Sequence, residues 1–143
     1  MDEVIQLASG AIVTPLKRIE HPKGDVLHGL KATDDTFRGF GEAYFSTVLP
    51  GITKGWKRHE RMTLNLVVPV GTIEFHLRSL DGQIADSIRL GETRYARLTV
   101  PPGVWMAFTG IGASLNLLLN VASIPHDPTE AVNVPLEHFS LES

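Results

Sequence analysis

The sequence Gly51-Ile-Thr-Lys-Gly-Trp-Lys-Arg-His-Glu60, read together with Pro101-Pro-Gly-Val-Trp-Met106, decides the fold of this chain. Each stretch begins at a turn signal made of proline and glycine and continues into residues typical of a β-strand. Alternate side chains of a strand share a face. In the predicted strand 53–59, one face therefore carries Gly55, Lys57 and His59, and the other carries Lys54, Trp56 and Arg58.

Short strands between frequent turns are predicted along the rest of the chain. The predicted strands are 12–19, 25–31, 41–48, 53–59, 63–70, 72–79, 84–90, 95–100, 105–108 and 114–122. Asp81-Gly82 predicts a hairpin between two of them. No helical period is sustained over more than two turns, so the pattern indicates an all-β sandwich or barrel. The tail from Ser123 is broken by prolines and is expected to pack on the outside of the barrel.

Composition restricts the class of protein. A chain of 143 residues predicts a single domain, 1–143, with a sizeable core. The net charge of −3 argues against a nucleic-acid partner. There is no cysteine, which excludes disulfides and thiolate chemistry. Neither a signal peptide nor a run of roughly 20 apolar residues is found, so we expect no membrane partner and a cytoplasmic protein.

Strand phase suggests which side chains meet in a cavity. Thr63, Asn65 and Val67 share one face of their strand, and Asn116, Leu118 and Asn120 share one face of another. The opposite face of the latter strand is wholly apolar: Leu115, Leu117, Leu119 and Val121. We therefore expect polar faces to line a cavity and apolar faces to lie outside it.

With these residues in hand, the chain resembles the dTDP-4-dehydrorhamnose 3,5-epimerases and the neighbouring dTDP-sugar 3,4-ketoisomerases. The resemblance covers roughly residues 37 to 128. It is carried by Gly39-Phe-Gly-Glu-Ala-Tyr-Phe45, Lys54-Gly-Trp-Lys-Arg-His59, Asn65-Leu-Val-Val-Pro-Val-Gly71, Pro101-Pro-Gly-Val-Trp-Met-Ala-Phe108 and His126-Asp-Pro128. It implies an all-β double-stranded β-helix, the jelly-roll cupin fold, and proton transfer beside the ketone of a nucleotide-linked sugar without a metal.

The resemblance also implies roles for individual residues. Lys54 stands where the family has a phosphate-binding arginine, Lys57 where it has the catalytic histidine, and His59 at the second histidine of the ketoisomerases. Glu42 matches an acidic residue of the family, and Tyr44 lies near a tyrosine that the ketoisomerases use. Asn120 falls at the tyrosine acid of the epimerases and cannot transfer a proton.

Proton abstraction beside a carbonyl needs a base and a group that stabilises the oxyanion. His59 is the predicted base, and Lys57 is the predicted cation, partner acid or Schiff-base amine. Lys54 is expected to contact a phosphate. Predicted substrate contacts are Glu42, Tyr44, Asn65, Asn116, Asn120 and Trp105. No cofactor is expected: where metal cupins place ligands, this chain has Lys57, Asn65 and Met106 beside His59.

Structural interpretations of the same residues stay open. Lys57 and His59 are also compatible with a solvated strand face, and the three asparagines with pairing of buried backbone. Trp56 and Trp105 are also typical of core or dimer packing. His21, His28, His76, His126 and His138 show no ligand spacing and are expected to be structural or surface residues.

Three functions follow from these alternatives. The first is a nucleotide-sugar epimerase or isomerase of surface-polysaccharide assembly, acting on a dTDP-4-keto-6-deoxyhexose as a homodimer. Pairing would cover exposed sheet edges and apolar strand faces. The second is a non-catalytic sugar or sugar-nucleotide binding cupin. It is favoured because Lys57 and Asn120 stand where the family has its catalytic histidine and its tyrosine acid. The third is a metal-dependent cupin oxygenase.

Overall fold

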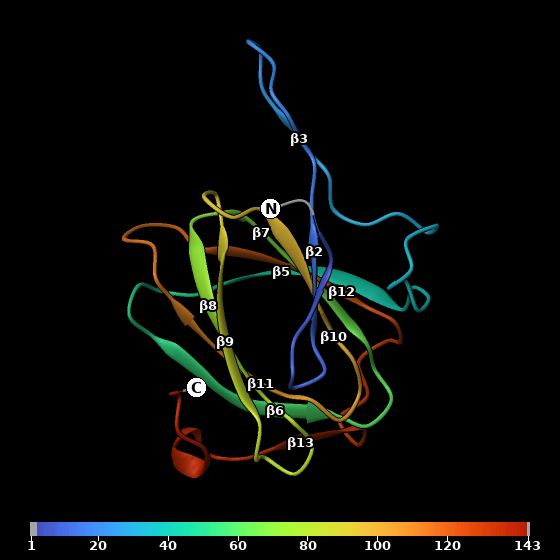
Figure 1. Ribbon diagram of the computed structural model, residues 1–143, viewed down its shortest axis with the longest axis vertical. Coiled ribbons are helices and arrows are strands. Elements are labelled where there is room, and N and C mark those ends of the chain that lie inside the picture. Colours follow the sequence, from blue (N-terminus) through green and yellow to red (C-terminus); the bar gives the residue numbers. More distant parts are fainter. Residues whose placement is uncertain (1–2, 143) are drawn as a thin grey trace.

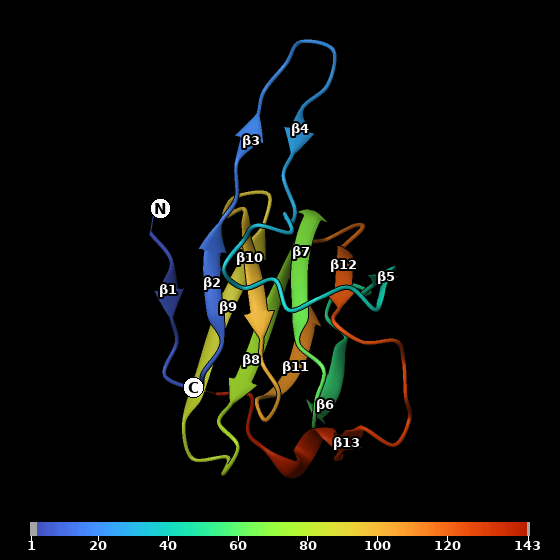
Figure 2. The same cartoon turned by 90° about the vertical axis from the view of Figure 1, so that its right-hand side faces the viewer.

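Two antiparallel β-sheets pack face to face in the computed structural model, which describes residues 3–142 (Figures 1 and 2). Met1, Asp2 and Ser143, which belong to the predicted domain, lie outside the described residues. The larger sheet has the order β1 (Ile5–Gln6), β2 (Ile12–Pro15), β10 (Ala96–Val100), β7 (Leu64–Val70), β12 (Leu117–Ala122) and β5 (Glu42–Thr47). The smaller sheet has the order β13 (Ala131–Asn133), β6 (Thr53–His59), β11 (Trp105–Gly110), β8 (Thr72–Arg78) and β9 (Ala85–Gly91).

This arrangement confirms the predicted all-β jelly roll. Every predicted run contains a strand, although 12–19 divides into β2 and β3 (Arg18–Ile19), and 25–31 contains only β4 (Val26–Leu27). The predicted hairpin is present between β8 and β9, where Gly82 takes a φ of +77° that suits glycine. The short strands β1 and β13 were not predicted.

The core lies between the two sheets. The larger sheet contributes Val13, Leu66 and Leu98, and the smaller one contributes Phe75 and Leu77, all of them fully buried. Burial of each such side chain stabilises the fold by about 1.5–3 kcal/mol. In β7 the apolar residues at alternate positions point inward, so the prediction that the Asn65 face of this strand lines the cavity is wrong.

The C-terminal tail covers the outer face of the smaller sheet. Trp56 and Trp105 form a second apolar cluster there with Val132, Val134, Leu136, Phe139 and Leu141. The Trp56 indole N–H donates to the Leu136 carbonyl (3.0 Å), at the start of the 3-10 helix η1 (Leu136–His138). The prediction that the tail packs outside the barrel is confirmed, and the tryptophans serve packing.

The segment that holds β3 and β4 leaves the sandwich as a two-stranded arm (Figures 1 and 2). It pairs only with itself among the strands of residues 3–142. Within that same range, no helix has the length and apolar character needed to cross a membrane.

Candidate functional site

A cavity of about 270 Å³ opens between the two sheets. Its apolar lining is Met62, Leu64, Val100, Val104, Met106 and Phe108, and its polar lining is Glu42, Tyr44, Ser46, Lys54, Lys57, His59, Asn120 and His126. The side chains come from β5, β12, β7 and β10 in one sheet, from β6 and β11 in the other, and from the adjoining loops. An apolar pocket with a few convergent polar groups is the usual form of a small-molecule site.

A β-bulge in β6 decides which cations face the cavity. Met106 of β11 pairs with Lys57, but Phe108, two residues later, pairs with Lys54, so β6 has one extra residue in this interval. Such an insertion reverses the phase of the strand. Lys54 therefore lines the cavity together with Lys57 and His59, whereas plain alternation placed it on the opposite face.

The imidazole of His59 is hydrogen-bonded through Nδ1 to Oε1 of Glu130. The Glu130 side chain is only 2% exposed. Its Oε2 accepts backbone N–H groups of Glu60 (3.1 Å), Arg61 (3.1 Å) and Met62 (3.3 Å). Burial raises the pKa of Glu130, but hydrogen bonds from His59 and from the backbone outweigh burial, so that its pKa is lowered overall.

An ionised Glu130 fixes the orientation of the His59 ring. A carboxylate only accepts hydrogen bonds, so Nδ1 carries the hydrogen that it shares with Glu130. The other ring nitrogen, Nε2, is then the one left for a ligand, and in the neutral imidazole it is unprotonated. This is the arrangement that a general base needs.

The two pocket lysines differ in their contacts. The Lys54 ammonium donates to the Thr47 carbonyl (2.8 Å) and lies 5.9 Å from the centre of the Phe108 ring. The Lys57 ammonium makes no hydrogen bond or ion pair with any residue in the range 3–142. A cation without a counterion in a cavity is available to an anionic or polar ligand.

The opposite wall carries Tyr44 and Asn120, which are paired directly across β5 and β12. The Asn120 amide donates to the Tyr44 carbonyl (3.3 Å) and to the Ser46 hydroxyl (3.0 Å). Burial, together with the nearby charge of Glu42, raises the pKa of the Tyr44 phenol. Glu42 itself accepts the backbone N–H of His126 (2.6 Å).

Three residues predicted to contact the substrate lie outside this cavity. Asn65 faces the outer side of β7, where it bonds Thr36 and Thr99. Asn116 is fully buried, and its amide bonds the backbone around it. Trp105 faces the tail. We therefore correct all three assignments, since strand packing directs these side chains away from the cavity.

Sequence reasoning missed two residues of the site. Glu130 contacts His59 from a position 71 residues away, and no local pattern signals that contact. His126, expected to be structural or on the surface, is exposed as expected, but it also lines the cavity. Its place in the segment His126-Asp-Pro128, which carries the family resemblance, was a signal for it.

Across residues 3–142, no group of three or more histidines, cysteines and carboxylates is placed to hold a metal ion.

Known proteins provide an independent comparison. No protein-family model matches the sequence, and no curated protein is significantly similar to it. A dTDP sugar isomerase from Desulfovibrio desulfuricans G20 is 37% identical, with 92% of this chain and 90% of that chain covered and a TM-score of 0.85.

Two more distant structures share the fold. A sugar 3,4-ketoisomerase from Thermoanaerobacterium thermosaccharolyticum in complex with TDP is 22% identical, with 85% and 86% of the chains covered and a TM-score of 0.74. A dTDP-4-dehydrorhamnose 3,5-epimerase from Sulfolobus tokodaii is 17% identical, with 98% and 86% covered and a TM-score of 0.82.

Proposed function

The chain belongs to the family of dTDP-sugar isomerases, and from this premise we propose that it transfers a proton beside the ketone of a dTDP-4-keto-6-deoxyhexose. The observation that carries the proposal is the His59–Glu130 pair at a cavity that also contains an unpaired lysine. We further propose that no metal takes part.

His59 is the base in this proposal. Its Nε2 removes the proton from the carbon next to the ketone, and Glu130 stabilises the imidazolium that forms. The buried carboxylate keeps its charge because four hydrogen bonds hold it. The arrangement therefore favours proton transfer without movement of the base.

Lys57 stabilises the enolate. Removal of the proton moves negative charge onto the ketone oxygen, and a fixed cation beside that oxygen lowers the barrier. Lys57 precedes His59 by two positions on the same strand face, so both side chains reach the same small ligand.

The remaining polar groups hold the substrate. Lys54 is proposed as the phosphate contact, and Glu42, Tyr44 and Asn120 as contacts to the sugar. A cavity of about 270 Å³ lies near the lower limit of the roughly 300–1,000 Å³ found for ligand pockets. It suits the sugar ring, with the nucleotide extending over the rim.

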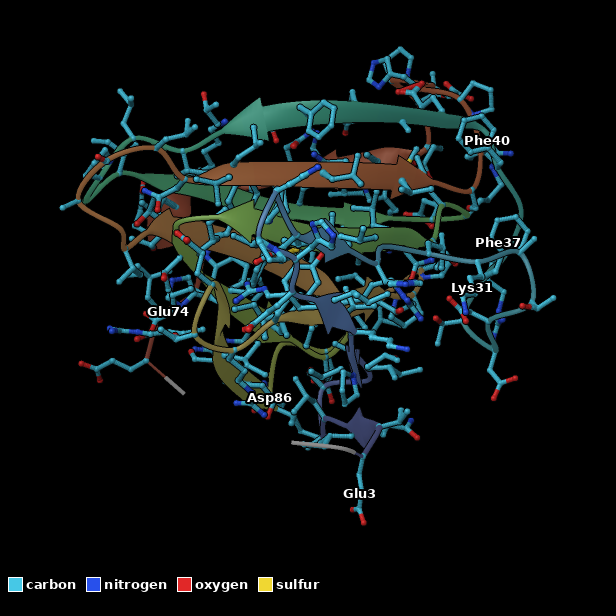
Figure 3. The ribbon with its side chains drawn as sticks, turned by 90° about the horizontal axis from the view of Figure 1, so that it is seen from above. Glu3, Lys31, Phe37, Phe40, Glu74 and Asp86 are labelled. Atoms are coloured by element: carbon cyan, nitrogen blue, oxygen red, sulfur yellow. The ribbon has the colours of Figure 1, made fainter. Side chains whose placement is uncertain are left out.

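A homodimer is part of the proposal. β5 is the edge strand of the larger sheet (Figure 3), and Phe45 on it is 65% exposed. The arm has exposed apolar side chains at Ile19 and Val26, and an isolated two-stranded hairpin is marginally stable in water. A second copy of the chain would cover both features. A place in surface-polysaccharide assembly in the cytoplasm stays a prediction.

Asn120 at the position of the family's tyrosine acid favours a second candidate, a binding protein without catalysis. The two functions are separated by incubating the purified protein with dTDP-4-keto-6-deoxyglucose and following the sugar by NMR. We expect a new keto sugar to form with wild-type protein and not with His59→Asn. Saturable binding without any new sugar would reject the isomerase in favour of the binding protein.

A further inference from the structure

The cavity contains a second imidazole whose role is not yet assigned. His126 lines it from the loop that joins β12 to β13, and the same loop supplies Glu130. The Glu130 N–H donates to the Asp127 carbonyl (3.1 Å), so residues 127–130 form a turn. Glu130 holds the His59 ring, and the imidazoles of His59 and His126 line the same cavity.

The loop is held tightly against the wall of the cavity. The His126 N–H donates to Oε1 of Glu42, at the start of β5. A Cβ on Gly41 would collide with the backbone of Ile124 and Pro125, so the close approach of the two segments requires glycine there. Asp127 is paired with Arg61 (3.2 Å). The backbone of His126 is therefore held in place at the rim of the cavity.

Inversion of the carbon beside the ketone needs a second proton-transfer group besides His59, and few lining residues can serve once Lys57 is assigned to the enolate oxygen. Asn120 cannot transfer a proton. Burial raises the pKa of Tyr44, which weakens it as an acid. Lys54 donates to a backbone carbonyl, and Glu42 accepts a backbone N–H. An imidazole both accepts and donates a proton in general acid–base chemistry.

We propose that His126 is a further catalytic residue, the group that returns a proton to the substrate. This inference rests on the proposed function. His59 takes the proton from the carbon beside the ketone, and the electron pair of the broken C–H bond enters the enolate. Protonated His126 then gives its proton to the other face of that carbon as the ketone reforms, and exchange with water resets both imidazoles.

The experiment compares two readouts in D2O with dTDP-4-keto-6-deoxyglucose. The first is deuterium entry at the carbon beside the ketone, which needs only removal and return of a proton by His59. The second is formation of a new sugar. For His126→Asn we expect deuterium entry within about 3-fold of wild type and product formation slowed by about 100-fold or more. His138→Asn, on the outer face, serves as the matched control.

The outcomes separate the two claims. If wild-type protein gives neither deuterium entry nor product, the proposed function is wrong, and the role of His126 is rejected with it. If wild type gives both deuterium entry and product, and His126→Asn forms product at a rate within 3-fold of wild type, only the role of His126 is rejected. Equal loss of both readouts in His126→Asn also contradicts it, because such a loss would indicate a general disturbance of the site.

Discussion

Glu130 and His59 are hydrogen-bonded to each other although 71 residues separate them in the sequence. The contact is built by the pairing of β13 with β6, in which Ala131 lies opposite His59. Glu130 directly precedes β13, so the register of this short strand sets the carboxylate beside the imidazole. The C-terminal tail is thereby part of the site and not merely a cover on the sheet.

Glu130→Gln should slow the reaction by roughly 100-fold or more, because the neutral amide no longer stabilises the His59 imidazolium. KM should change little, since Glu130 does not line the cavity. Steady-state kinetics measure both constants. Glu130→Asp, which keeps the negative charge, should have a kcat between those of wild type and Glu130→Gln. An unchanged kcat in Glu130→Gln, or a kcat of Glu130→Gln that added salt restores, would contradict the role of this carboxylate.

The same carboxylate should make stability depend on pH. The pKa of Glu130 is lower in the folded protein than its ordinary value of 4.5, so the folded state binds fewer protons than the unfolded one. The stabilisation is complete above about pH 4.5 and is lost as pH falls through the folded pKa. Urea unfolding from pH 7 to 3 should show this loss in wild type and a smaller one in Glu130→Gln. An equal loss of stability with falling pH in the two proteins would show that Glu130 is not the group responsible.

Lys57→Gln should lower kcat by about 100- to 1,000-fold, the usual effect of removing one group that stabilises an oxyanion. Lys54→Gln serves as the matched control, because the proposed phosphate contact should act on KM and leave kcat within a few fold. Kinetics at several ionic strengths measure both. A fall in kcat for Lys54→Gln equal to that for Lys57→Gln would contradict the division of roles.

The positions of the strands could be predicted from the sequence, because turn residues and β-formers act locally. The orientation of the Lys54 side chain toward the cavity could not be predicted, because the bulge in β6 arises from pairing with β11. The outward orientation of Asn65 could not be predicted either, since packing against the second sheet decides which face of β7 is inner. Glu130 was missed for the same reason: its contact forms only when the tail pairs with β6.

The homodimer can be tested through Phe45, which is 65% exposed on the edge strand β5. Phe45→Glu would bury a charge in the proposed interface and should shift the protein to the monomer in analytical ultracentrifugation. Leu80→Glu makes the same kind of change at a residue that is 64% exposed in the turn between β8 and β9, and should not alter the mass. A wild-type monomer at all concentrations would reject the dimer.

The central claim is that the imidazole oriented by Glu130 removes a proton from a keto sugar. Its most direct test is the initial rate at which solvent deuterium enters dTDP-4-keto-6-deoxyglucose, measured by mass spectrometry for wild type and His59→Asn at saturating substrate. We predict rapid entry with wild type and a rate at least about 100-fold lower with the variant. Equal rates for the two proteins would show that His59 is not the base.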